Sequence, residues 1–546
     1  MTQPMSPEND AAGHALPHGV LSRRRLLQCA GLGLLAAGTP PVARAAAEAP
    51  IVQLRSGRVR GVRDGASFVF KGIPYGADTS TSRFAPPQRE PAWRGIREAT
   101  QPGLACPQLN ASEPTGEDCL SLNVWTPGLG DRAKRPILVY IHGGAFSTGS
   151  GSDPLYDGRR LSRRGDVVVV TVNHRLNAFG YLFLAQLGDA GLAQSGNAGQ
   201  LDLIAALHWV REHAEAFGGD AGNVTVFGQS GGGAKIATLM AMPAARGLFH
   251  RAWTMSGQQV TAAGPRAATQ RAQRYLEALG VGPDQLARVK QLPSAALVGA
   301  LRVRDPSRVE DTALYLGPVL DGQALPRHPF WPDAPPQGAQ IPMVVGNTRD
   351  ETRAFLGNDA RHFTLDWDAL PALLERQQFV DLPTKGVIDE YRRLYPRYTP
   401  SEVFFAATTA GRSWRGAVET LEARARQGAP TWAYQLDWYD RGGPHASRRA
   451  FHTLDIPLVF DNVGQPGAAT GDGPGARAMA ATMADALLAF ARHGDPRHPG
   501  LADWSPYTLE RRQTMVFDDA SRLEDDPRGG ERRLYAQAPF LQRGTQ

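Results

Sequence analysis

Cysteine, concentrated charge and long apolar runs are all scarce in this chain of 546 residues. The formal net charge of +6 is scattered. Because no basic stripe carries interleaved aromatic residues, nucleic-acid binding is not expected. No spacing of His, Cys, Asp or Glu matches a metal site, and we expect no metal or cofactor. After the first 45 residues, no segment is apolar enough to span a bilayer, so we expect no stable membrane anchor.

The first 45 residues have the pattern of an export signal. A basic segment, Arg23 to Arg25, precedes an apolar run over 29–38 and a small-x-small site at 43–45. The paired arginines resemble the twin-arginine type of signal. Because the apolar run is well short of the roughly 20 residues that span a bilayer, we expect a cleaved leader. Residues 46–546 are then exported, to the periplasm or out of the cell.

Two cysteines, Cys106 and Cys119, remain after cleavage. An oxidising compartment favours a disulfide between them, and the alternative is a pair of reduced, buried thiols. The bridge would close a short loop and stabilise the fold by about 3 kcal/mol.

One stretch organises the rest of the chain: residues 224–233 read V-T-V-F-G-Q-S-G-G-G. A strand pattern leads into the glycines, and a helical pattern follows over 234–240. Gly228 and Gly232 lack the Cβ atoms that would clash at a sharp turn, so Ser230 can be held in a strained conformation with its hydroxyl exposed. We therefore predict a nucleophile elbow. A serine nucleophile needs a base, a group that orients the base, and donors for the oxyanion.

Strand patterns alternate with helical patterns on both sides of the elbow. Residues 136–141 and 166–173 have the composition of strands buried on both faces, whereas 201–217 has helical spacing. This alternation predicts a largely parallel sheet flanked by helices. The first strand ends in Gly143-Gly144, where such a fold places an oxyanion loop. A carboxylate is expected beyond the strand at 342–347, and by position alone Asp350 and Glu351 fit equally well.

Several further segments match a known family in the right order. They are F-K-G-I-P-Y (70–75), R-F-A-P-P (83–87), E-D-C-L-S-L-N-V-W-T-P (117–127), H-G-G-A-F (142–146), G-N-A-G-Q-L-D (196–202) and F-G-G-D-A-G-N-V-T-V-F-G-Q-S-G-G (217–232). In these segments the chain resembles the type-B carboxylesterases, which are cholinesterase-like α/β hydrolases. The resemblance implies one α/β-hydrolase domain over 46–546, with a large, mostly parallel sheet. Proline-broken helical patterns predict lid-like insertions near 258–310 and 360–428.

The resemblance also assigns roles to individual residues. It implies Ser230 as nucleophile, Glu351 as acid and His452 as base, whereas His445 lies in a polar loop and is most simply solvated. Ser256 matches a serine that supports the acid. The remaining implied features are a disulfide between Cys106 and Cys119 and three oxyanion donors, the backbone N–H groups of Gly144, Ala145 and Gly231.

Three residues depart from the family pattern. Ala145 replaces the third glycine of the oxyanion loop, and its Cβ is expected to crowd the acyl side of the site. Gln229 and Gly231 replace the usual Glu and Ala around the serine. Loss of a carboxylate weakens attraction for cationic substrates. The loop between the two cysteines also has no tryptophan for a choline site, so we do not expect a specialist for choline esters.

These observations predict an exported serine esterase that acts on a small-molecule ester through an acyl-enzyme. An amide or carbamate hydrolase would use the same residues. A non-catalytic binding protein on the same fold is a further alternative, but such proteins usually lack part of the triad. The sequence leaves the natural ester and the oligomeric state open.

Overall fold

An eleven-stranded sheet is the framework on which the site is built. The computed structural model describes residues 49–305, 313–501, 503–542 and 545, and the predicted leader lies outside these ranges. From one edge to the other, the strands are β14 (Arg522–Asp525), β13 (Gln513–Phe517), β12 (Thr431–Leu436), β11 (Met343–Thr348), β10 (Arg251–Met255), β9 (Gly219–Gln229), β7 (Arg135–Ile141), β8 (Val168–Val172), β6 (Ser121–Thr126), β4 (Ser67–Pro74) and β3 (Val62–Asp64). A separate small sheet consists of β1 (Ile51–Gln53), β2 (Arg58–Arg60) and β5 (Ile96–Glu98).

The centre of the large sheet is parallel, from β8 through β7, β9, β10, β11 and β12 to β13. Its two edges are antiparallel, at β3, β4 and β6 on one side and at β14 on the other. In β9, β10 and β11 the residues Gln229, Met255 and Gly346 lie side by side. Parallel strands therefore end together at one edge, and the segments that follow them meet there.

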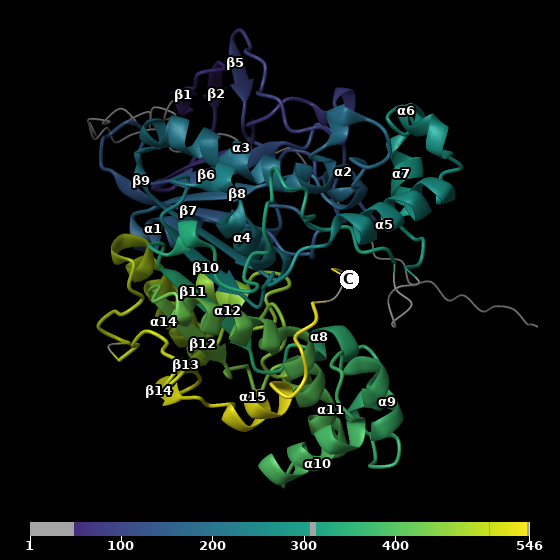
Figure 1. Cartoon of the computed structure of the whole chain (residues 1–546). Coiled ribbons are helices and arrows are strands. Elements are labelled where there is room, and N and C mark those ends of the chain that lie inside the picture. The colour runs from purple at the N-terminus through teal and green to yellow at the C-terminus, as the bar shows by residue number, and fades with distance from the viewer. Residues whose placement is uncertain (1–48, 306–312, 502, 543–544, 546) are drawn as a thin grey trace, which may run out of the picture. The chain divides into compact units, whose positions relative to one another are not determined.

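Helices connect and cover the strands (Figure 1). They are α1 (Arg159–Gly165), α2 (Asn177–Tyr181), α3 (Ala198–His213), α4 (Gly231–Ala241), α5 (Pro265–Ala278), α6 (Leu286–Val289), α7 (Ser294–Ala300), α8 (Arg353–Leu356), α9 (Leu370–Gln377), α10 (Thr384–Leu394), α11 (Pro400–Thr409), α12 (Arg415–Arg426), α13 (Asp455–Val459), α14 (Pro474–His493) and α15 (Gly529–Tyr535). None of those in the described ranges is long and apolar enough to cross a membrane.

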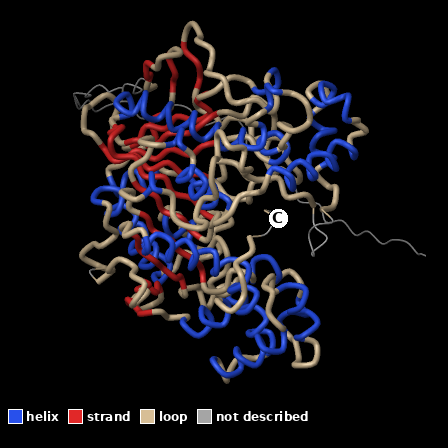
Figure 2. The backbone as a smooth tube through the Cα atoms, in the orientation of Figure 1, coloured by secondary structure: helices blue, strands red, loops and turns tan. Residues whose placement is uncertain are grey.

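Alternation along β7 shows how the sheet is buried on both faces. Ile137 and Val139 pack into one core with residues of α3, α4 and α12, whereas Leu138 and Tyr140 pack into a second core with α1, α13 and α14. Period-two alternation sends neighbouring side chains to opposite faces, and both faces are covered by helices (Figure 2). This arrangement confirms the predicted α/β-hydrolase fold.

A third hydrophobic cluster lies away from the sheet. It joins α9, α10 and α11 to Leu534 and Tyr535 of α15, and Figure 1 shows these helices gathered into one bundle. The described residues from Ala49 onward form one compact unit. Within it, α5 to α7 and α9 to α12 fall in the two stretches where the sequence predicts helical insertions.

Candidate active site

Ser230 is the single residue between β9 and α4, at the predicted elbow. Its backbone has φ 55° and ψ −124°, a strained conformation that surrounding structure must enforce. The N–H of Ser230 donates to the carbonyl of Met255 at 2.7 Å. At Gly232 a Cβ atom would lie 1.9 Å from the carbonyl oxygen of Ile141. The turn is therefore fixed by neighbouring strands, and only glycine permits so close an approach.

Glu351 and His452, which are 101 residues apart in the chain, form a buried pair. The carboxylate accepts a hydrogen bond from Nδ1 of His452. Its other oxygen accepts from Nδ2 of Asn347 at 3.1 Å and from the N–H of Thr348 at 3.0 Å. With the Nδ1 proton committed to the carboxylate, Nε2 of His452 is an acceptor, which is the state a general base requires.

Opposing effects set the pKa of Glu351. Burial raises it, but the attraction of His452 and the hydrogen bonds that the carboxylate accepts lower it more, so the net pKa lies below the ordinary value. Ser256 directly follows β10, and its hydroxyl contributes to this lowering. Among the described residues, however, its Oγ has no hydrogen bond of ordinary geometry. Glu351 is therefore ionised at neutral pH and available to orient the imidazole.

The two competing candidates for acid and base lie elsewhere. Asp350 accepts a hydrogen bond from Nε of Arg353 at 3.0 Å, and among the described residues it has no hydrogen bond to the imidazole. His445 is exposed in its loop. The structure thus brings Glu351 to His452, which position in the sequence alone could not decide.

Gln229 makes a contact that the sequence did not predict. Its amide Nε2 lies 3.2 Å from Nε2 of His452, and its side chain is buried. In the described residues, Oγ of Ser230 has no hydrogen bond to His452. The amide of Gln229 is therefore hydrogen-bonded to the nitrogen that would receive the serine proton. Catalytic hydrogen bonds are often incomplete in the absence of substrate.

The predicted oxyanion donors lie on two segments in contact. Gly144 and Ala145 both have positive φ, 81° and 51°. Gly231 is the first residue of α4, where a helix leaves its N–H groups without internal partners. A Cβ atom at Gly231 would lie 2.1 Å from the carbonyl oxygen of Ala145. The oxyanion loop and the elbow are thus packed backbone to backbone.

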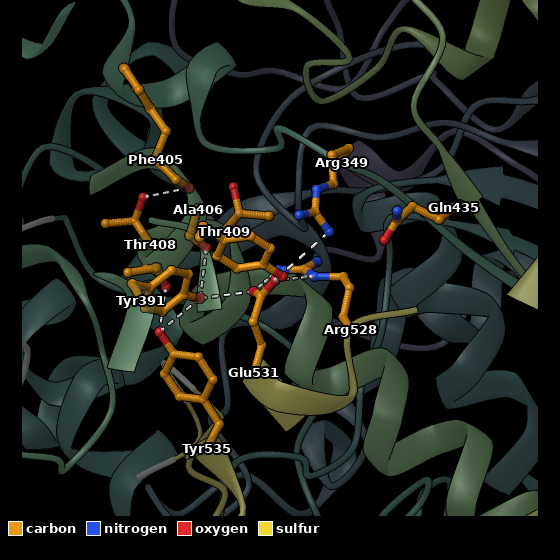
Figure 3. A network of polar contacts seen from close by, with 12 residues as sticks. Arg349, Tyr391, Phe405, Ala406, Thr408, Thr409, Gln435, Arg528, Glu531 and Tyr535 are labelled. Carbon is orange, nitrogen blue, oxygen red and sulfur yellow. Dashed lines mark hydrogen bonds and ion pairs between the residues drawn. The ribbon is translucent and has the colours of Figure 1, made fainter. Parts of the chain in front are cut away.

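The loop that carries Glu351 is tied to the helical bundle on both sides. Before the acid, Arg349 forms an ion pair of 3.7 Å with Glu531, which is also bonded to Arg528 and to Tyr391 (Figure 3). After it, the hydroxyl of Thr352 bonds to Thr408 at 2.8 Å and Thr409 at 3.0 Å in α11, and to the carbonyl of Phe405 at 3.0 Å. The position of the acid therefore depends on the bundle, and no local sequence pattern predicts these contacts.

An exposed aromatic ring lies next to the base. Phe355 in α8 is 45% exposed, and its ring centroid is 4.8 Å from that of His452. The guanidinium of Arg412 lies 5.0 Å from the centroid of Phe355 and 5.0 Å from that of Phe379. Arg412 belongs to a π-helical turn, Ala410–Trp414, a feature frequent at functional sites. An exposed aromatic ring with a guanidinium beside it therefore lies against the imidazole.

The predicted disulfide is not formed in this structure. Cys106 and Cys119 are both free, buried thiols. A hydrogen bond with Cys106 and burial raise the pKa of Cys119 well above its ordinary value. Sγ of Cys106 also accepts from the N–H of Leu176 at 3.2 Å. The two sulfurs are neighbours, as a bridge requires, and the pairing stays a prediction.

Comparisons with known proteins agree with this geometry. Residues 48–533 match the carboxylesterase family. The chain is 36% identical over 496 residues to para-nitrobenzyl esterase of Bacillus subtilis (strain 168), which covers 88% of this chain and 97% of the relative. It is 32% identical to fumonisin B1 esterase of Sphingopyxis macrogoltabida, over 89% of each chain.

Solved structures give the same result. Carboxylesterase EST55 of Geobacillus stearothermophilus matches with a TM-score of 0.79 at 38% identity, over 89% of this chain and 99% of that one. A structure of PNB esterase matches with a TM-score of 0.75 at 35% identity, over 88% and 99%. The predicted resemblance and the predicted activity, hydrolysis of carboxylic esters, are confirmed. The chain belongs to the carboxylesterase family.

Proposed function

We propose that this esterase works through Ser230, His452 and Glu351. Ser230 attacks the ester carbonyl while Nε2 of His452 takes its proton, and the same nitrogen then protonates the departing alcohol. A water molecule activated by His452 hydrolyses the acyl-enzyme. The observation that carries the proposal is the buried pair of His452 and Glu351, held through Gln229 beside the elbow.

The oxyanion that forms in each step is stabilised by backbone N–H groups of Gly144, Ala145 and Gly231. Donors fixed before the reaction pay no reorganisation cost as charge develops. The close approach of Gly231 to the backbone of Ala145 supports this assignment, because it brings the two segments that carry these donors together. For the base to act, the amide of Gln229 must leave Nε2, and we infer that an entering substrate displaces it.

The substrate is an uncharged ester with an aromatic or alkyl group on one side of the ester bond. Phe355 supports this class because its exposed ring lies against His452, where part of the substrate must lie. Gln229 supports it as well, because a neutral amide replaces the carboxylate that would attract a cation. The name of the relative para-nitrobenzyl esterase agrees with an aromatic group.

We also propose that the protein is exported through its twin-arginine leader and that Cys106 and Cys119 pair after export. The neighbouring thiols and the oxidising destination support this pairing. Titration of free thiols in protein recovered from the periplasm or medium tests it. Two titratable thiols after unfolding would contradict the disulfide.

The central test uses p-nitrophenyl esters from acetate to decanoate with the mature protein, Ser230→Ala and a control, Ser112→Ala, at an exposed position. We expect Ser230→Ala to lose hydrolysis and labelling by a fluorophosphonate, and Ser112→Ala to keep both. Folded wild-type protein that hydrolyses none of the esters and takes no label at Ser230 would overturn the proposed mechanism.

A further inference from the structure

A lysine is completely buried directly behind the oxyanion loop. Lys235 lies in the second turn of α4, five residues after Ser230, and its side chain is inaccessible to solvent. Helical side chains lean toward the N-terminus of their helix, so this one extends back beneath the elbow. Among the described residues no carboxylate forms an ion pair with it. Burial of an ammonium without a counterion costs free energy. The hydrogen-bond partners of Lys235 must therefore compensate for the loss of water.

The ammonium of Lys235 is bound by the oxyanion loop itself. Nζ donates to the carbonyl of His142 at 3.1 Å and to that of Ala145 at 2.8 Å. It also lies 5.7 Å from the centroid of the Phe146 ring, within the range of a cation–π contact. These contacts bracket the segment His142 to Phe146. Both carbonyls belong to residues on either side of Gly144, so one cation fixes the loop at its two ends.

The other titratable groups near Lys235 are kept neutral. Burial, followed by the repulsion of Lys235, lowers the pKa of His142 to about 3, and the same causes lower that of His174. The two rings are stacked, with centroids 4.7 Å apart. Nδ1 of His142 donates to the carbonyl of Gly143 at 2.9 Å. Burial lowers the pKa of Lys235 itself to about 7. Near neutral pH the site beneath the loop therefore contains two neutral imidazoles and a lysine close to its pKa, so Lys235 carries its charge more fully as the pH falls below 7.

We propose that Lys235 is a positioning residue of the esterase, which holds the oxyanion loop so that the N–H groups of Gly144 and Ala145 point at the substrate carbonyl. The inference rests on the proposed function. Two fixed carbonyls leave the peptide groups between them little freedom to rotate. When Lys235 is protonated, its charge also favours the negative oxygen that forms on the other side of the loop.

A role confined to packing predicts different behaviour. Methionine has nearly the length of lysine and needs no hydrogen bonds, so it would fill the same space without a buried charge. If Lys235 only filled space, Lys235→Met would leave turnover unchanged. If it holds the loop, the variant loses transition-state binding while substrate binding and folding stability are preserved.

The test compares Lys235→Met and Lys235→Gln with wild type on p-nitrophenyl butyrate, with turnover expressed per serine labelled by a fluorophosphonate. Thr238→Val is the matched control, because its hydroxyl is buried on the same helix and, in the part of the chain that the structure describes, bonds only to the helical carbonyl of Ala234. For Lys235→Met we expect kcat to fall about tenfold to a hundredfold with KM within threefold. Inhibition by a trifluoromethyl ketone, which forms an oxyanion with the serine, weakens by a similar factor.

Glutamine keeps two N–H bonds on a shorter side chain, so Lys235→Gln should retain more activity than the methionine variant. Unchanged kcat in Lys235→Met overturns the proposal, as does an equal loss in Thr238→Val. Absence of a folded, labelled fraction in both lysine variants also overturns it, since Lys235 would then serve folding alone. Failure of the proposed function can be told apart from failure of the Lys235 proposal, because wild type itself would then show no Ser230-dependent hydrolysis.

Discussion

A single methyl group at Gly231 is expected to disable the oxyanion hole. The added Cβ would lie 2.1 Å from the carbonyl oxygen of Ala145 and 2.5 Å from its Cα and carbonyl carbon. Carbon and oxygen atoms in close contact are ordinarily about 3.3 Å apart, so the overlap is about 1 Å. Either the loop or the start of α4 must move by that amount. Because a misplacement of about 1 Å can cost a hundredfold in rate, Gly231→Ala should lower kcat by about that factor.

The same geometry predicts a compensating change. Ala145 has φ 51°, a conformation that alanine adopts with strain and glycine adopts freely. Ala145→Gly should therefore let the loop withdraw from a methyl group at position 231. We expect Ala145→Gly alone to remain within about threefold of wild type and the double variant to regain at least tenfold over Gly231→Ala. This exchange restores the glycine and alanine that the family usually has at these two positions.

The assay is kcat and KM on p-nitrophenyl butyrate for the four proteins, read as a double-mutant cycle. Gly264→Ala is the control, because a Cβ at Gly264 meets nothing within 4 Å and its φ of −69° suits any residue. The reasoning is refuted if Gly231→Ala stays within threefold of wild type. It is also refuted if the double variant is no faster than Gly231→Ala, because the two positions would then act independently.

Three further substitutions test other parts of the site. Glu351→Gln should lower kcat on p-nitrophenyl butyrate by about a thousandfold or more, because an amide no longer fixes the Nδ1 proton of His452; activity within tenfold would contradict the assignment. Gln229→Glu should raise kcat/KM for butyrylthiocholine relative to that for a neutral thioester. It should also shift the acid side of the pH–rate profile to higher pH, because a carboxylate beside Nε2 of His452 favours the protonated ring. If neither the ratio of the two kcat/KM values nor the pH–rate profile changes, the contact between Gln229 and His452 is contradicted. Burial raises the pKa of Glu531, but Arg528 and other neighbours lower it to about 2, so its contribution is present above about pH 4.5 and disappears as the pH falls toward 2. Glu531→Gln should therefore lower the free energy of unfolding at pH 7 by about 3 kcal/mol, as measured by urea denaturation. The variant should also lose less stability than wild type between pH 7 and pH 3. Equal free energies of unfolding at pH 7 and pH 3 in wild type would contradict this contribution of Glu531.

Local patterns were enough to predict the centre of the fold. The valine-rich run that became β8 and the apolar run that became β7 are buried on both faces, so hydrophobicity alone marked them as strands. The elbow was predictable for a related reason, since its glycines and serine are adjacent in sequence. The short strands β5 and β14 were not predicted. Both are partly exposed and charged, and they are strands only because a neighbouring strand pairs with them.

Some residues of the site can be predicted from their neighbours in the sequence, whereas others depend on contacts with distant segments. Ser230 could be identified from its neighbours, but the choice of Glu351 over Asp350 needed either the family resemblance or the folded chain. Those two carboxylates differ in which way the turn after β11 directs them, and that turn is fixed by contacts to α11 and α15 far along the sequence. Lys235 shows the limit most clearly. In the sequence it is the one charged residue of α4, and a charged residue usually marks the solvent-exposed edge of a helix. Only the fold shows that the edge is covered by the oxyanion loop, and that the loop supplies the carbonyls which make a buried ammonium tolerable.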